Sequence, residues 1–307
     1  VNTRLRKGVL HTGTQVALVG CYANLTYPVE HLGVTTETLE KIALGQHPFC
    51  EKLKAAKKPA IIISNRAIQR QDGQAIFAAA NMIAQKYNVI QDKWDGFNIL
   101  HQGANTVGLL DIGFEDRFAS LRATKCDSTH PWKNAKVIYM LEADDVDGTQ
   151  FSSDSFVIYQ GHHGDRGAAL ANLVLPGASY AEKSGTYINM EGRVQKSEVA
   201  LFPPGQAKLD EVVLRSLFGE DWQPDALADP DESLLSPALA NVTETMPSDR
   251  VIKEDVSPAA LQFQGAPLGP PVDNYYMTDP ISRSSVTMAK CTRLGNKPSN
   301  FDVVFDN

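Results

Sequence analysis

Paired cysteines are missing from this sequence of 307 residues. Its four cysteines lie far apart, at Cys21, Cys50, Cys126 and Cys291, and none belongs to a Cys-x-x-Cys pair. Iron–sulfur clusters and structural zinc ions usually take at least two ligands from one tight loop. We therefore expect no metal centre built on these cysteines, and we interpret them as reduced, buried thiols of a reducing compartment.

Long apolar runs and dense basic clusters are also missing. The longest apolar runs, such as Ala60–Ile63 and Val137–Leu141, are far too short to cross a bilayer. The densest basic cluster is Arg4, Arg6 and Lys7, which we interpret as part of a solvated surface strand. The formal net charge of −7 disfavours nucleic acid as a partner. We expect neither a direct membrane span nor a nucleic-acid interface.

Apolar runs of strand length alternate with helical patterns over the first two thirds of the chain. The predicted strands are Gln15–Gly20, Pro59–Ser64, Lys136–Leu141, Ser155–Gln160 and Leu173–Leu175. The predicted helices are Thr36–Ala43, Asp72–Lys86 and Phe97–Leu110. Continuous apolar strands suit a parallel sheet that is covered on both faces. This order predicts an α/β fold with a doubly wound, mostly parallel sheet.

After Pro176 the pattern changes to that of an antiparallel hairpin. Tyr187–Val199 reads as two strands, with Glu191 and Gly192 supplying the turn. We include this hairpin region in one α/β domain that covers residues 1–219.

Residues 220–307 have the composition of an extended tail. They hold ten of the seventeen prolines, and the stretch Glu220–Asp255 has ten acidic residues against Arg250 and Lys253. Such a segment buries little apolar surface by itself. We predict an extended acidic, Pro-rich tail that wraps a neighbouring surface, with Tyr275–Met277 and Phe301–Phe305 as aromatic anchors.

The densest polar segment, Gln160–Gly167, directly follows a predicted strand. Ligands of open α/β sheets bind at the carboxyl ends of strands, and His162, His163 and Asp165 suit a metal ion or acid–base catalysis. However, adjacent side chains diverge, no second ligand motif occurs, and the glycine spacing differs from the dinucleotide fingerprint. The pattern favours a packed structural loop in which both imidazoles and Asp165 satisfy one another and local backbone groups.

Patterns for nucleophilic catalysis are weak. No Gly-x-Ser-x-Gly elbow occurs, and Ser179, Ser184 and Ser197 are typical of turns and strands. Cys21 follows a predicted strand, but no histidine motif accompanies it. We predict no catalytic residue among them.

Two acidic residues in the hairpin region form a possible carboxylate pair, Glu182 and Glu191. In such a region they are more typical of salt bridges, here with Lys183 and Arg193. The residues thus give no catalytic, cofactor-binding or metal-binding site that we would assign to this chain.

Segments distributed along the whole chain resemble one family. They are Asn2–Lys7, Tyr159–Asp165, Leu175–Gln195, Tyr276–Ser285 and Met288–Cys291. In order and spacing they are similar to the C-terminal, molybdopterin-oxidoreductase-like region of the 75-kilodalton iron–sulfur subunit of mitochondrial respiratory complex I, NADH:ubiquinone oxidoreductase. The stretch Glu220–Gly269 matches poorly.

The resemblance implies a structural part of the machinery that passes electrons from NADH to ubiquinone. It implies that the iron–sulfur clusters lie in an N-terminal part without a counterpart here, and that no cofactor belongs to this chain, although the segment like Glu182–Gln195 lies near the pterin in related enzymes. We expect a peripheral-arm subunit on the matrix side of the mitochondrial inner membrane. Because the chain starts inside the α/β region, we also expect a split subunit with a separate cluster-bearing chain.

Two other functions remain open from the sequence. A pterin- or nucleotide-binding oxidoreductase domain would hold its ligand near His162, His163 and Asn189, and the missing phosphate-binding loop counts against it. A metal-dependent hydrolase would use His162, His163 and Asp165, and it lacks a second set of ligands.

Overall fold

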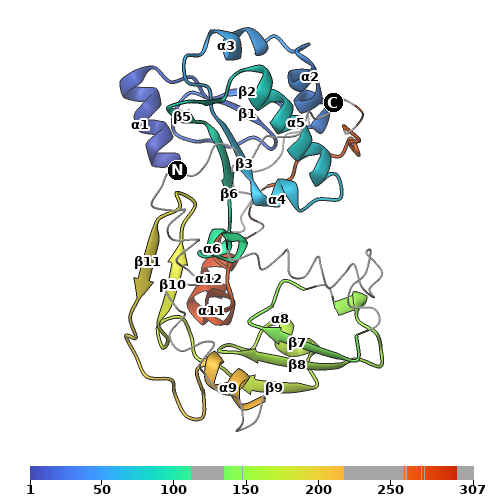
Figure 1. Ribbon diagram of the computed structural model, residues 1–307, viewed down its shortest axis with the longest axis vertical. Coiled ribbons are helices and arrows are strands. Elements are labelled where there is room, and N and C mark those ends of the chain that lie inside the picture. The colour runs from blue at the N-terminus through green and yellow to red at the C-terminus, as the bar shows by residue number, and fades with distance from the viewer. Residues whose placement is uncertain are drawn as a thin grey trace. The chain divides into compact units, whose positions relative to one another are not determined.

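The computed structural model describes residues 1–111, 135–146, 148–217, 259, 261–270, 272 and 274–295 (Figure 1). The chain divides into two compact units. Unit 1 takes residues 1–102, 247–273 and 293–307, and unit 2 takes residues 103–246 and 274–292. The predicted division at residue 219 stays a prediction, since residues 218–258 lie outside the described part. So do Cys126 and the predicted anchor at 301–305.

Unit 1 begins with helix α1, Asn2–Thr12, so the surface strand predicted around Arg4, Arg6 and Lys7 is wrong. Alternating basic residues imitate a strand, but the partly buried residues Leu5, Gly8 and Val9 recur at helical spacing. The helix ends at Gly13, whose φ of 67° is the left-handed conformation that glycine adopts readily.

The strands of unit 1 form small sheets. β1 (Ala17–Val19) pairs in parallel with β2 (Glu30–Gly33), and β3 (Ile61–Ser64) pairs in parallel with β6 (Phe97–Leu100). β4 (Ile90–Gln91) and β5 (Trp94–Asp95) form a short antiparallel pair. The predicted strands at 15–20 and 59–64 are confirmed.

The predicted helix Phe97–Leu110 is wrong in its first part, which is strand β6. Its apolar residues also fit a strand pattern, and pairing with β3 decides between the two periods. Phe97 packs edge-on against Phe77 of α5, with ring centroids 5.9 Å apart. The helix, α6, covers Thr106–Asp111 and belongs to unit 2.

Helices supply most of the core of unit 1. They are α2 (Thr36–Leu44), α3 (Cys50–Ala55), α4 (Asn65–Ile68) and α5 (Gly73–Lys86), and the predictions at 36–43 and 72–86 are confirmed. The buried cluster consists of Ile42, Ala43, Cys50, Ala79, Ile83 and Tyr87. Small residues on α5 allow α2 to approach it closely, and α2 ends at Gly45 with a φ of 82°.

Unit 2 is built on a three-stranded parallel sheet in the order β7-β8-β9 (Figure 1). These strands are Val137–Leu141, Phe156–Gly161 and Leu173–Pro176, as predicted. Alternate residues of β7 and β8 form a buried cluster of Ile138, Met140, Val157 and Tyr159. The short helix α8 (Arg166–Leu170), which connects β8 to β9, packs Ala168 against it.

The remaining described elements of unit 2 include the predicted hairpin. β10 (Gly185–Ile188) pairs antiparallel with β11 (Val194–Ser197), and Gly192 in the turn has a φ of 76°. α6 adjoins β10, because the Asn105 side chain just before it donates to Thr186 O and accepts from Ile188 N. A 3₁₀ turn (Gly148–Gln150) and helices α9 (Asp210–Leu217), α11 (Pro280–Ser284) and α12 (Val286–Gly295) complete the described elements.

The α/β class and the parallel pairing are thus found, but the described strands form several small sheets instead of one continuous doubly wound sheet. No helix in the described ranges is both long and apolar enough to cross a membrane.

Candidate functional site

Polar side chains gather at the carboxyl ends of β7, β8 and β9, where open α/β sheets receive their ligands. Glu142 directly follows β7, and Gln160 lies at the end of β8. Tyr139 of β7, Lys183 from the segment before β10 and Asp210 at the start of α9 join them. We call these five residues the strand-end network.

The strand-end network is closed by contacts among its own members. Lys183 Nζ lies 2.7 Å from Glu142 Oε1 and 2.6 Å from Asp210 Oδ2. Gln160 Nε2 donates to Asp210 Oδ1 at 2.7 Å, and the Tyr139 hydroxyl donates to Gln160 Oε1. The ammonium therefore joins the end of β7 to the start of α9, and the buried amide links the remaining groups.

Burial and the neighbouring carboxylates shift the pKa of Lys183 in opposite directions. Burial by itself lowers the pKa of Lys183, but the hydrogen bonds to Asp210 and Glu142 outweigh it, so the pKa lies above its ordinary value. Burial, together with the negative charge of Asp210, raises the pKa of the Tyr139 hydroxyl. At neutral pH Lys183 is thus a cation held between two carboxylates, which makes it a poor candidate for a general base.

The backbone of the network is shaped for these contacts. Glu142 has a φ of 51°, a left-handed conformation that is uncommon for residues other than glycine. Its N–H donates to Gln160 O at 2.8 Å, and its carboxylate turns to Lys183. Gly177 after β9 allows close approach, because an added Cβ would lie 3.3 Å from Asp210 Oδ1. Such local strain persists where the surroundings fix it.

Two glycines of the loop after β8 lie where a larger side chain would not fit. A Cβ at Gly161 or Gly167 would lie within 2.7 Å of the Tyr159 side chain, and one at Gly167 would also lie 2.5 Å from Ala143 O. The Tyr159 hydroxyl donates to Asp144 Oδ2 at 3.1 Å, and burial raises its pKa. Asp144 is itself buried and accepts from Gly167 N at 3.0 Å. Packing around the buried Tyr159 therefore explains these two glycines, and a phosphate-binding role is not required to explain them.

The histidines of this loop contact each other. Their Nδ1 atoms lie 2.6 Å apart, and their rings meet edge to face. The predicted mutual satisfaction with Asp165 is wrong, because Asp165 pairs with Arg283, 118 residues away in the sequence. This pairing could not be predicted from the local sequence pattern, because the two residues lie so far apart in the chain.

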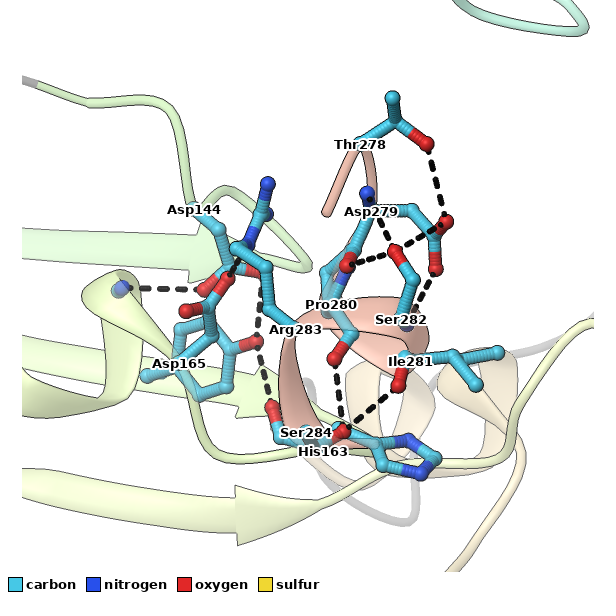
Figure 2. Close-up of polar contacts among 12 residues, drawn as sticks. Asp144, His163, Asp165, Thr278, Asp279, Pro280, Ile281, Ser282, Arg283 and Ser284 are labelled. Atoms are coloured by element: carbon cyan, nitrogen blue, oxygen red, sulfur yellow. Dashed lines mark hydrogen bonds and ion pairs between the residues drawn. The ribbon is translucent and has the colours of Figure 1, made fainter. Parts of the chain in front are cut away.

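Arg283 extends from α11 to the loop after β8, as Figure 2 shows. Its Nε lies 2.5 Å from Asp165 Oδ2, and the two side chains are 16% and 13% exposed. α11 is held in turn by a capping box, in which Asp279 accepts from Ser282 N at 3.0 Å and Ser282 Oγ accepts from Asp279 N at 3.1 Å. These bonds to Ser282 hold the pKa of Asp279 below its ordinary value.

The other residues that the sequence singled out have local structural roles. Asn189 Oδ1 accepts from the backbone N–H groups of Glu191 and Arg193 and so shapes the hairpin turn. Glu182 accepts from Ser179 N at 2.8 Å. The predicted salt bridge of Lys183 with a hairpin carboxylate is replaced by its pairs with Glu142 and Asp210.

The cysteines also differ in their surroundings. Cys50 is buried in the core of unit 1, and its thiol approaches Ile42 O at 3.6 Å. Cys21 is partly exposed in unit 1, and Cys291 is partly exposed in unit 2. Over the described ranges, no three His, Cys, Asp or Glu side chains are arranged to hold a metal ion.

Sequence reasoning missed the strand-end network. A search for polar residues directly after predicted strands finds Glu142 and draws attention to Gln160. Asp210 and Arg283 carry no such signal, because they reach their partners from 50 and 118 residues away.

The sequence of this chain is similar to those of oxidoreductase subunits. The family model described as molybdopterin oxidoreductase matches residues 1–220. A second model, which describes the C-terminal part of the NADH-ubiquinone oxidoreductase G subunit, matches residues 242–291.

Curated relatives agree with these matches. The chain is 38% identical over 303 residues to the NADH-ubiquinone oxidoreductase 75 kDa subunit of Reclinomonas americana, covering 96% of this chain and 42% of the relative. It is 38% identical to NADH dehydrogenase [ubiquinone] iron-sulfur protein 1, mitochondrial, of Solanum tuberosum, covering 97% and 39%. It is 37% identical to the mitochondrial NADH-ubiquinone oxidoreductase 78 kDa subunit of Candida albicans, covering 95% and 40%. The predicted resemblance is confirmed, and the chain spans about two fifths of these relatives' length.

The cofactors that these names imply can be tested against the residues present. An iron–sulfur cluster needs a group of cysteine ligands, and the described cysteines form no such group. A pterin at the strand ends needs polar groups that are free to bind it, whereas the five side chains of the strand-end network already bind one another. The described cysteines therefore do not fit a cluster, and the side chains of the strand-end network, paired as they are, do not fit a pterin.

Proposed function

Because the chain belongs to the molybdopterin oxidoreductase family and its relatives are named as subunits of NADH-ubiquinone oxidoreductases, we propose that it is a structural, non-catalytic part of respiratory complex I. In this role it supports the subunits that carry electrons from NADH to ubiquinone, and it binds no cofactor itself. Its place is the peripheral arm, on the matrix side of the mitochondrial inner membrane.

The strand-end network carries this proposal. A ligand-binding α/β domain keeps the carboxyl ends of its strands open to a ligand. Here Lys183 crosses that position between Glu142 and Asp210, and Gln160 is fully buried beneath it. Half-buried charges that are paired with one another favour a scaffold over a binding site, since a ligand would first have to break the pairs.

The iron–sulfur clusters of the assembly belong, in this proposal, to a companion part. The relatives extend over more than twice the length that matches this chain, and one is named as an iron–sulfur protein. Among the described residues, no three His, Cys, Asp or Glu side chains are grouped to hold a metal ion, which supports this division. We therefore propose that this chain binds and supports a cluster-bearing partner, together with other subunits of the peripheral arm.

A native gel of mitochondrial membranes in mild detergent tests the assembly role. We expect this chain in the band that oxidises NADH, together with cluster-bearing polypeptides identified by mass spectrometry. Migration of the chain as an isolated protein, away from that band, would contradict the proposal.

Variants of the network separate a scaffold from a catalyst. Lys183→Met should lower the amount of assembled complex, while the NADH oxidation rate per assembled complex stays unchanged. A matched control, Lys196→Met on the exposed side of β11, should alter neither quantity. A lower rate per assembled complex, or pterin recovered from the washed and denatured chain, would favour the ligand-binding alternative.

A further inference from the structure

Residues 261–268 of the C-terminal segment lie along unit 1, with Gly265 in the left-handed conformation (φ 69°), and we call them the strap. Leu261 and Phe263 pack against the core cluster of α2, α3 and α5, while Gln262 between them is exposed. Over Leu261–Phe263 this alternation is that of a strand with one face buried, whereas Gln264–Pro267 are exposed. The strap therefore joins the hydrophobic core of unit 1 and is not merely a covering on its surface.

The strap crosses the carboxyl-end loops of three strands. Leu268 N donates to Val34 O at 2.9 Å after β2, and Pro267 forms an antiparallel bridge with Thr35. After β1, Gly20 has a φ of 135°, and an added Cβ there would lie 3.6 Å from Leu268 Cβ. These loops occupy the same topological position as the strand-end network of unit 2.

A guanidinium after β3 and α4 binds the backbone of the strap. Arg70 donates through Nε and Nη2 to the carboxylate of Asp72, at 2.8 and 3.2 Å. The same side chain donates through Nη1 to Pro267 O at 2.8 Å and through Nη2 to Ala266 O at 3.3 Å. One planar group thus contacts two consecutive carbonyls, a geometry that a lysine ammonium does not reproduce.

Asp72 contacts both Arg70 and the strap. Its side chain is 1% exposed, and it also accepts from Gln264 N at 3.3 Å. The hydrogen bond from Arg70 holds the pKa of Asp72 below its ordinary value. The buried carboxylate therefore orients Arg70 toward the strap and binds the strap directly.

These contacts resemble those of a receptor for a peptide segment. Backbone groups of residues 264–268 make four hydrogen bonds to unit 1, the Gln264 side chain donates to Gln71, and Leu261 and Phe263 pack on the core, a combination of backbone contacts and apolar anchors that also serves in peptide recognition. We propose that residues 261–268 are an internal peptide ligand of unit 1, which occupies its strand-end loops and holds them in one conformation. The contact is a separable interface, so the strap remains bound when the chain is cut upstream of it. This goes beyond the assembly role proposed above and does not depend on it.

Hydrogen exchange in a nicked full-length chain tests the proposal. A recognition site for a specific protease is inserted after Met246, the chain is cut in its folded state, and exchange is followed at the amides of Gln264 and Leu268. Both amides donate to unit 1. We expect their protection to survive the cut. Loss of protection at both amides after the cut would overturn the proposal.

Substitutions then test whether Arg70 of unit 1 binds the strap. Arg70→Ala should speed exchange at both amides by about tenfold or more, as expected for losing charge-assisted hydrogen bonds, and Arg70→Lys should have an intermediate effect. Lys52→Ala, which removes an exposed ion pair of unit 1, is the control and should change neither amide. The amide of Tyr87, which donates to Ile83 O at the C-terminal end of α5, reports whether unit 1 stays folded. If Arg70→Ala unfolds it, Leu268→Pro removes the bond to Val34 from the strap side and should speed exchange at Gln264. Unchanged protection in a folded Arg70→Ala or Leu268→Pro chain would refute the strap as a ligand.

Discussion

Unit 1 and unit 2 fill the same topological position by different means. In unit 2 the strand ends are closed by charged and polar side chains around Lys183, with Glu142 and Asp210 as its partners. In unit 1 they are covered by backbone carbonyls and N–H groups of the strap, which Arg70 and Asp72 bind. The closure of unit 2 depends on the two ion pairs of Lys183. The closure of unit 1 depends on the guanidinium of Arg70 and on two apolar side chains, Leu261 and Phe263.

The two closures include groups that titrate at opposite ends of the pH range, Lys183 in unit 2 and Asp72 in unit 1. The pKa of Lys183 is raised, so its contribution to stability is complete below its unfolded pKa and is lost as pH rises through the folded value. The pKa of Asp72 is lowered from 3.8, so its contribution is complete above its unfolded pKa and is lost as pH falls through the folded value. Alkali therefore weakens the closure of unit 2, and acid weakens that of unit 1.

The largest expected effect is that of Lys183→Met. This change leaves two neighbouring carboxylates without their shared cation, and we expect the free energy of unfolding to fall by about 3 kcal/mol at neutral pH. Chemical denaturation with a probe in unit 2 measures it, and the exposed Lys196→Met should stay within about 0.5 kcal/mol of the parent. A loss for Lys183→Met no greater than that of the control would break the comparison, because unit 2 would then not depend on its ion pairs.

The next effect concerns the glycines that surround Tyr159. Gly167→Ala places a Cβ against Ala143 O and the tyrosine ring, so we expect a loss of about 2 kcal/mol from overpacking. Gly164→Ala is the matched control, because an added Cβ there has no heavy atom within 4 Å. Thermal unfolding of both variants measures the difference. Equal stabilities would show that the loop after β8 is loosely packed.

The smallest effect is that of Asp72→Asn, for which we expect a loss of about 1–2 kcal/mol at neutral pH, since the amide keeps one acceptor for Arg70. The diagnostic result is the pH dependence: the difference between parent and variant should shrink as pH falls below 4 toward the lowered pKa. Unfolding measured from pH 7 to pH 2 gives this profile. A difference that is constant over the range would show that the charge of Asp72 does not hold the strap.

Local patterns in the sequence were sufficient for much of the fold. The apolar runs within Lys136–Leu141 and Ser155–Gln160 predicted parallel strands, because strands covered on both faces need such runs, and β7 and β8 pair in parallel there. Glu191 and Gly192 predicted the hairpin turn, because glycine adopts a positive φ readily. The stretch Phe97–Leu100 was read as helix, because its apolar residues fit both periods and the pairing with β3 lies outside the local pattern.

The sequence by itself determined the α/β class and the family resemblance, because both depend on residues that are close together or on their order. Only the tertiary structure decided the partners of the polar groups. Lys183 meets Asp210, Asp165 meets Arg283, and Arg70 meets Pro267 across 27, 118 and 197 residues. Ion pairs and backbone contacts of this kind leave no periodic signal, because they depend on which chain segments the fold brings together.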